Sequence, residues 1–196
     1  MVKPAPPLKR GARQRILEAA NAVAERAGAA ILTLEAVAAE AGVSKGGLLY
    51  HFASKEALLA GVVEFHMAEH RACLEAMEAR YPATGGGYLQ AYIDAQLAMA
   101  SEHKEADALR SFIAAAVHMP GLLDLPREDA RAHLARLRGL GPGFVEALVL
   151  TLALDGLFFS SAFEMLDLTA DEQRALAEGL AAAAARVASR EDARAD

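Results

Sequence analysis

The chain has 196 residues, 54% of them hydrophobic, with a net charge of −6 and a single cysteine, Cys73. This length allows one large domain or two small ones with a buried core. One cysteine excludes an internal disulfide framework, and the N-terminus has no apolar signal segment, so we expect a protein of the reducing cytoplasm. Because Ala and Leu are abundant and no alternation of apolar and polar residues is sustained, the sequence predicts an all-α protein.

The charge is unevenly distributed along the chain. Residues 1–55 hold eight Lys and Arg against four Asp and Glu, whereas residues 56–196 hold twelve against twenty-two. A basic part on an acidic remainder is expected when one module contacts DNA and the other does not. Residues 1–10 combine three prolines with three basic residues, so we expect a mobile basic arm, which either touches DNA or is a tail without function.

Two short amphipathic helices are predicted first. Apolar residues at positions 16, 17, 20 and 23 share one face of a helix over about 12–27, which ends at Gly28. A second helix, over about 34–41, has Thr33 as its N-cap and turns its apolar face to the first helix.

The next turn is very short. Gly42 ends the second helix and Ser44 is the N-cap of a third, so only Val43 separates the two. Such a Gly-marked turn between two helices is typical of a helix-turn-helix. In the third helix, over about 45–52, we expect Leu48 and Phe52 to pack inward. The outer face is then left to Lys45, Gly46, Gly47, Leu49, Tyr50 and His51.

Two lysines occupy the first positions of helices, where the helix dipole disfavours a cation. Lys45 begins the third predicted helix, and Lys55 begins the fourth after its N-cap Ser54. Backbone amides at helix N-termini together with lysines form sites for phosphate. The pattern therefore indicates an anionic partner such as DNA; the alternative is a solvated Gly-rich turn with surface lysines.

From Arg13 to about Gly61 the sequence resembles the N-terminal domain of the TetR family of bacterial transcriptional regulators. One departure is Leu49, which stands where the family most often has Tyr, so that Tyr50 must carry more of the DNA contact. The resemblance covers about a quarter of the chain. The matching residues are Ile16-Leu17-Glu18-Ala19-Ala20, Gly28, Leu32-Thr33-Leu34, Val37-Ala38, Glu40-Ala41-Gly42-Val43-Ser44-Lys45-Gly46, Tyr50-His51-Phe52 and Ser54-Lys55-Glu56-Ala57-Leu58.

This resemblance implies a homodimeric regulator, most often a repressor that a small, largely apolar ligand releases from a palindromic operator. Residues 1–55 would form the DNA-binding domain and residues 56–196 a helical ligand-binding and dimerisation domain. The contacts to DNA would come from Ser44, Lys45, Gly46, Gly47 and Leu49 on the recognition helix and its cap, and from Thr33, Tyr50, His51 and Lys55, which would mainly hold phosphates.

The rest of the chain brings the expected total to about nine helices. A helix from Lys55 to about residue 80 would span roughly 39 Å and belong to both domains as a lever. Gly85–Gly87 is predicted to be the clearest loop. Further helices are expected over about 88–101, 104–117, 126–138, 143–166 and 169–189.

The last two helices hold more apolar surface than one layer needs, and the TetR resemblance implies that they form a four-helix dimer interface. The most apolar run, Phe144–Phe159, is shorter than a membrane span requires, so we expect a buried helix and no membrane partner. Asp155 lies within this run, where an unpaired carboxylate is costly to bury. It either bonds across the dimer seam, faces a ligand, or points outward.

Three interpretations remain open for the side chains that share one face of the helix over 55–80, namely His66, His70, Cys73 and Met77. They line a small-molecule pocket, opposite Phe112, Ile113 and Ala116; they form a metal- or thiol-responsive site; or they are structural. His103, His118 and His133 are unclustered in the sequence, which weakens the metal interpretation, so we expect no metal or cofactor.

An enzyme and a helical interaction module are the two alternative classes of function. The sequence has no nucleophile elbow with a Ser-His-acid order, no phosphate-cradling Walker loop and no paired-carboxylate helix motif, so we do not expect an enzyme. A helical interaction module without DNA binding is the remaining alternative, and the Gly42–Lys55 segment argues against it.

Overall fold

The computed structural model describes residues 11–27, 32–100, 110, 113 and 115–195, and these contain helices and turns but no strand, as the sequence predicts. Residues 110, 113 and 115–118 are helical, and all but residue 118 fall in the predicted 104–117 helix. Most of that predicted helix lies outside the described residues, as do the 1–10 arm, Gly28, His103 and Phe112. The bounds are α1 (Ala12–Ala27), α2 (Leu34–Ala41), α3 (Lys45–His51), α4 (Lys55–Glu78), α5 (Gly85–Ala100), η1 (Pro120–Leu123), α7 (Asp124–Arg138), η2 (Gly141–Gly143), α8 (Phe144–Ala162) and α9 (Ala170–Ala195).

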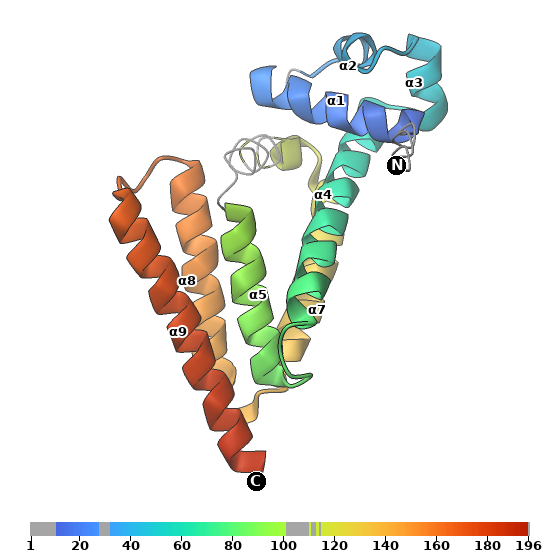
Figure 1. Ribbon diagram of the computed structural model, residues 1–196. Helices are drawn as coiled ribbons and strands as arrows, with labels where there is room; N and C mark the ends of the chain where they lie inside the picture. The colour runs from blue at the N-terminus through green and yellow to red at the C-terminus, as the bar shows by residue number, and fades with distance from the viewer. Residues whose placement is uncertain (1–10, 28–31, 101–109, 111–112, 114, 196) are drawn as a thin grey trace, which may run out of the picture.

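The helices form two groups joined by α4. Figure 1 shows α1, α2 and α3 gathered at one end of α4, which then runs beside α7 into a bundle with α5, α8 and α9. The edge of this bundle farthest from α4 is formed by α8 and α9 (Figure 1). At 24 residues, α4 is close to the predicted length and reaches both groups.

The core of the first group is built from apolar residues at helical spacing. Ile16 and Leu17 of α1 and Leu58 of α4 are almost completely buried there. Ala115 and Leu122, which come much later in the chain, belong to the same core. The group formed by α1, α2 and α3 and the remainder of the molecule therefore share apolar contacts beyond α4 itself.

A second core lies in the bundle around α5. Leu89 and Ile93 of α5 are fully buried, and they pack in one cluster with Leu137 of α7, Leu154 of α8 and Ala184 of α9. Since α5 touches α4, α7, α8 and α9, it is the central helix of the bundle.

The predicted loop at Gly85–Gly87 is wrong, because these glycines form the first turn of α5. A Cβ added to Gly86 would lie 2.4 Å from the Cα atom of Ala188, and one on Gly87 would lie 2.0 Å from the carbonyl oxygen of Pro82. The glycines are needed because the start of α5 lies directly against α9 and against the preceding turn.

The connection between α8 and α9 is longer than predicted. Helix α8 stops at Ala162 rather than near Leu166, because Glu164 adopts a left-handed conformation with φ 53° and the Met165 N–H bonds back to the Ser160 carbonyl. Helix α9 begins at Ala170, and Thr169 is its cap rather than its first residue. The Thr169 hydroxyl and backbone N–H both donate to the Glu172 carboxylate, and the Glu172 N–H donates to Thr169 Oγ1, which forms a capping box.

Helix α8 presents a stripe of exposed apolar side chains. Among the described residues, Gly141–Ala162 is the one stretch with the length and composition of a membrane-crossing helix. One such helix is weak evidence for a span, because an interface helix has the same composition. The α8 stripe consists of Val145, Val149, Leu152, Phe159 and Phe163, which are 38–67% exposed.

Candidate functional site

The turn between α2 and α3 has the predicted geometry. Gly42 ends α2 in a left-handed conformation with φ 64°, and the N–H of Val43 bonds back to the Ala38 carbonyl. Ser44 then caps α3, because its Oγ accepts a hydrogen bond of 3.0 Å from the Gly47 N–H. The sequence predicts both features because each depends only on neighbouring residues.

The two faces of α3 divide as predicted. Leu48 and Phe52 are buried in the first core, which fixes the rotation of the helix. Tyr50 is 86% exposed and Leu49 is 37% exposed, so an aromatic hydroxyl and an apolar side chain point away from the protein. The Tyr50 and His51 rings meet edge to face at 5.1 Å.

The remaining predicted DNA-contacting residues surround α3. Thr33 caps α2 through a bond from the Ala36 N–H (3.2 Å), and Ser54 caps α4 through a bond from the Ala57 N–H (3.1 Å). Lys55 is partly buried at the start of α4, and Ser44, Lys45 and Gly46 are exposed. The structure therefore brings the predicted residues to one end of the molecule, and their roles in DNA binding remain predictions.

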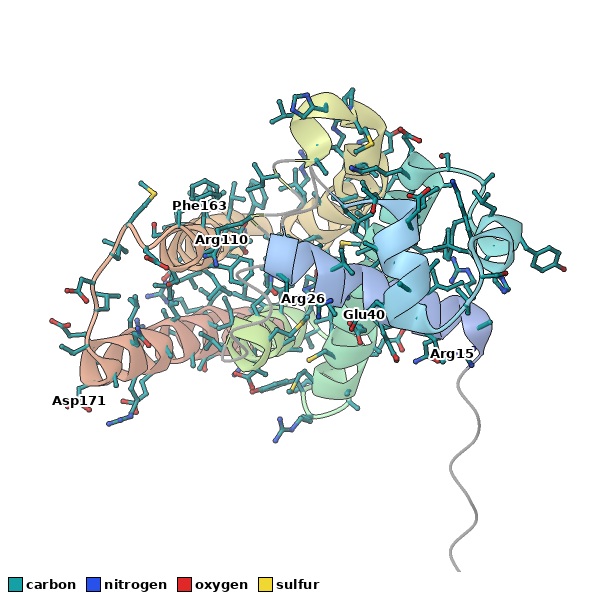
Figure 2. The ribbon with its side chains drawn as sticks, turned by 90° about the horizontal axis from the view of Figure 1, so that it is seen from above. Arg15, Arg26, Glu40, Arg110, Phe163 and Asp171 are labelled. Atoms are coloured by element: carbon teal, nitrogen blue, oxygen red, sulfur yellow. The ribbon has the colours of Figure 1, made fainter. Side chains whose placement is uncertain are left out.

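Lys45 has an acidic partner on α2. Its Nζ atom lies 2.6 Å from Oε1 of Glu35, and both side chains are more than half exposed. The hydrogen bond from Lys45 lowers the pKa of the Glu35 carboxyl, so this carboxyl is ionised at neutral pH. A second ion pair, between Arg26 of α1 and Glu40 near the other end of α2, is also 2.6 Å long (Figure 2).

The four side chains of the predicted α4 face have separate partners on different elements. His66 bonds to Asn21 of α1 (3.1 Å), whereas His70 bonds to Gln96 of α5 (3.1 Å). Cys73 faces the Ala95 carbonyl, and the Met77 sulfur accepts a bond from Arg80. Ile113 and Ala116 are partly buried. In the described part of the chain, no group of three or more His, Cys, Asp or Glu side chains is arranged to hold a metal ion.

A buried polar cluster lies in the bundle instead, and it includes His133, which stands apart from the other histidines in the sequence. The Thr151 hydroxyl donates to the Ala147 carbonyl, so its oxygen accepts from His133 Nε2 at 3.3 Å. His133 Nδ1 then accepts from the Tyr88 hydroxyl at 2.6 Å. This polar cluster comprises His70, Tyr88, Tyr92, Gln96, His133 and Thr151.

The second half of the polar cluster extends to α4. The His133 ring stacks on Tyr92 with centroids 3.9 Å apart, and Gln96 donates to the Tyr92 hydroxyl at 3.0 Å. The Gln96 carbonyl oxygen then accepts from His70 Nε2. Within the described residues no buried side-chain nitrogen or oxygen lacks a partner, so the cluster is satisfied by its own bonds.

Burial sets the protonation of the polar cluster. It lowers the pKa of His133 to about 4 and also lowers that of His70, so both rings are neutral at pH 7. Burial raises the pKa of Tyr88 to about 12, which keeps its proton available for His133. The Asp155 carboxyl is exposed on one side, but burial still raises its pKa, and its charge further raises the pKa of Tyr92. Asp155 therefore borders the polar cluster.

Two ion pairs tie α7 to α4 beside the polar cluster. The Arg136 guanidinium makes bonds of 2.6 and 2.9 Å to the two carboxylate oxygens of Glu78 and lies 3.5 Å from the centroid of the Tyr88 ring. Nearer the middle of α4, Arg71 contacts both carboxylate oxygens of Asp129. The Arg136–Glu78 pair is bidentate, whereas Arg71 shares one nitrogen between both oxygens, and together the two pairs favour one relative position of α4 and α7.

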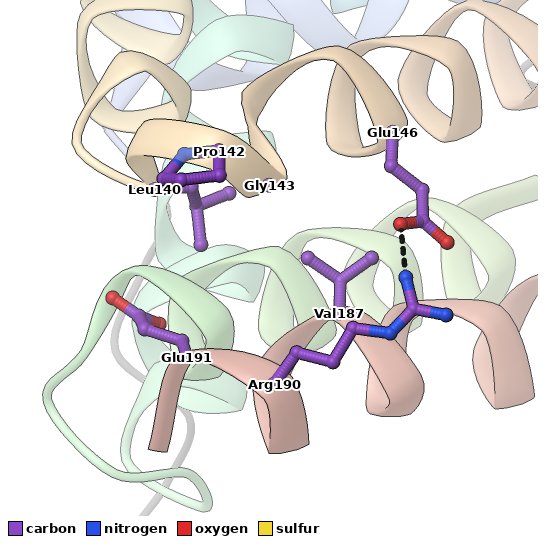
Figure 3. A pocket seen from close by; sticks show the side chains of 7 residues that line it. All are labelled: Leu140, Pro142, Gly143, Glu146, Val187, Arg190 and Glu191. Atoms are coloured by element: carbon purple, nitrogen blue, oxygen red, sulfur yellow. Dashed lines mark hydrogen bonds and ion pairs between the residues drawn. The ribbon is translucent and has the colours of Figure 1, made fainter. Parts of the chain in front are cut away.

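A small cavity lies elsewhere, between the start of α8 and the end of α9. Its volume is about 50 Å³, and the Arg190–Glu146 ion pair of 2.6 Å crosses its rim (Figure 3). Drug-sized ligands occupy pockets of about 300–1,000 Å³, so this cavity is too small for such a molecule. It is lined by Leu140, Pro142, Gly143, Glu146, Val187, Arg190 and Glu191.

A helix-turn-helix with an outward-facing third helix, carried on a helical bundle, defines a class of DNA-binding transcriptional regulators. Residues 16–62 match the family "Bacterial regulatory proteins, tetR family", and residues 86–185 match "Tetracyclin repressor-like, C-terminal domain". The chain belongs to the TetR family, as its resemblance over residues 13–61 predicts. None of the curated proteins matches its sequence.

Solved structures share the fold over most of the chain. A protein of Pseudomonas aeruginosa PAO1 described as a transcriptional regulator is 24% identical, with a TM-score of 0.69, over 89% of this chain and 92% of that chain. A TetR-family protein of Mesorhizobium loti MAFF303099 is 22% identical (TM-score 0.68; 93% and 95% covered). A transcriptional regulator of Rhodococcus sp. Rha1 is 23% identical (TM-score 0.66; 92% and 95%). At these identities the likeness shows the fold.

Proposed function

We propose that this TetR-family protein is a cytoplasmic, homodimeric repressor that binds a palindromic operator and is released from it by a small, largely apolar effector. Residues 1–55 would bind DNA, and residues 56–196 would bind the effector and form the dimer. The observation that carries the DNA-binding part is the geometry of α3. Its inner side chains Leu48 and Phe52 are buried in a core, the helix is capped by Ser44, and Tyr50 in its last turn is 86% exposed.

A homodimer is supported by the α8 stripe. A monomer that exposed these five apolar residues in one row would be prone to association. Leu176 of α9 adds to the exposed apolar surface at the same edge of the bundle. Two copies that pair α8 and α9 would bury this surface in a four-helix interface, and a two-fold axis would present two α3 helices to half-sites about one helical turn apart.

An effector site in the bundle is supported by the polar cluster and its link to α4. His70 is the α4 residue of this cluster, and Arg136 connects Tyr88 to Glu78 at the C-terminal end of α4. A ligand that replaced bonds of the cluster would move α4 relative to α7. Because α4 also carries part of the first core, such a movement would change the spacing of the two α3 helices.

Selection from a library of genomic DNA fragments tests this function. We expect enrichment of a palindromic site whose binding weakens steeply with salt. With that site in hand, a thermal-shift screen of metabolites, followed by operator release, would identify the effector, and His70→Ala should change effector affinity more than DNA affinity. No enrichment of any fragment by the folded protein would contradict DNA binding and favour a helical interaction module.

A further inference from the structure

The ion pair between Glu35 and Lys45 joins two elements that face DNA in the proposed function. Glu35 lies in the first turn of α2, two residues after Thr33, and Lys45 is the first residue of α3. The atoms are 2.6 Å apart, and the side chains are 63% and 57% exposed. Glu35 thus places a carboxylate against Lys45, whose position at a helix N-terminus indicates a phosphate site, and two residues after Thr33, which is predicted to hold phosphate.

This position has a physical consequence for binding to an anion. Lys45 cannot attract a phosphate with its full charge while Glu35 neutralises it, so the phosphate must displace the carboxylate. The displaced Glu35 then lies near the DNA backbone, where its charge is repelled or must recruit a cation from solution. Both effects weaken DNA binding without involving any base.

We propose that Glu35 competes with DNA phosphate for Lys45 and that this autoinhibitory ion pair keeps the sequence-independent DNA affinity of the protein low. The inference rests on the proposed DNA-binding function of α3. Because the pair is exposed, its effect is modest, about two- to fivefold in affinity for each protomer. When phosphate displaces Glu35, the freed carboxylate takes up about one cation for each protomer, which offsets one counterion released from the DNA. The pair therefore reduces the slope of log affinity against log salt by about one for each protomer.

The chain offers a matched control for the charge of Glu35. Glu40 lies on the same helix and makes an ion pair of the same length, but its partner is Arg26 of α1 rather than a residue of α3 (Figure 2). Glu35→Gln and Glu40→Gln therefore remove the same charge and one exposed ion pair each. The two variants are matched in the charge removed and differ in the place of the carboxylate on α2 and in the element that carries its partner, and the Lys45→Gln background below isolates the part of the partner.

The experiment measures anisotropy of a short fluorescent duplex of random sequence, titrated with full-length protein at several NaCl concentrations. Glu35→Gln should tighten binding about two- to fivefold for each protomer bound and steepen the salt slope by about one. Glu40→Gln should have a smaller effect. In a Lys45→Gln background, Glu35→Gln should lose most of its gain, because no cation remains to be released.

Three results would contradict parts of this scheme in distinguishable ways. If Glu35→Gln binds no tighter than the unmodified protein, Glu35 does not compete for Lys45. If its gain persists in the Lys45→Gln background or equals that of Glu40→Gln, the effect is that of net charge, and the ion pair has no special role. If all variants are folded by circular dichroism yet none binds any duplex, the DNA-binding function itself is wrong, and the competition falls with it.

Discussion

Substituting Gly86 by alanine tests how closely the start of α5 lies against α9. The added Cβ would lie 2.4 Å from Cα and 2.6 Å from Cβ of Ala188, well inside ordinary contact distance. Neither atom is the end of a flexible side chain, so the two helices themselves must separate. The same movement would stretch the hydrogen bond that the Gly86 N–H donates to the Glu191 carboxylate.

Contributions of opposite sign set the change in the free energy of unfolding. Overpacking of this kind costs about 1–3 kcal/mol, and weakening a bond to a charged group adds about 1 kcal/mol. Alanine regains at most about 1 kcal/mol of helix propensity, and less in a first turn. We therefore expect Gly86→Ala to lower the free energy of unfolding by about 2 kcal/mol, which corresponds to a Tm lower by about 4–8 °C.

Urea and thermal unfolding at one fixed protein concentration measure this difference. Gly179→Ala in α9 is the control, because a Cβ there would meet nothing within 4 Å; this variant should be as stable as the unmodified protein or more stable by up to about 1 kcal/mol. A Gly86→Ala protein with unchanged or raised stability would refute the close approach of α5 and α9.

Three further predictions concern other parts of the molecule. Burial lowers the pKa of His133 from 6.5 to about 4, so between these pH values the unfolded chain binds a proton on His133 that the folded chain does not bind. The free energy of unfolding therefore falls as the pH drops through this window. In urea unfolding between about pH 7 and pH 4.5, His133→Gln should remove roughly 2 kcal/mol of that loss, after allowance for partial exposure. Leu152 is 59% exposed on α8, so Leu152→Glu should weaken a dimer by at least about a hundredfold, as measured by sedimentation equilibrium. Thr169→Ala removes the α9 capping box and should lower the unfolding free energy by about 1 kcal/mol in urea.

The DNA-binding end could be predicted in detail because its structure is encoded locally. Thr33, Ser44 and Ser54 each cap the helix that the sequence assigns to them, and Gly42 has the left-handed conformation that its position requires. A cap depends on residues two or three positions away. The buried and exposed faces of α3 also follow from its own helical spacing.

The bundle was less predictable because distant contacts decide its details. A glycine is compatible with a turn and with a close contact between helices. For Gly86 the contact with Ala188, about a hundred residues later in the chain, decides for the second, and the local sequence does not contain that information. His133 belongs to the polar cluster because α7 lies against α5. A signal was nevertheless present, since Tyr88, Tyr92 and Gln96 are spaced four residues apart and form one polar face on the central helix.

The shared first core has a consequence for dividing this protein into parts. Ala115 and Leu122 are only 2% and 6% exposed within a core that otherwise belongs to α1–α4. A fragment that ended after α4 would open this core to water at both positions. A chimera that joined α1–α4 to the bundle of another regulator would have to supply apolar side chains of matching size at the same two places. A working chimera must therefore preserve the contacts between the two parts, and a cut at one position in the sequence is not sufficient.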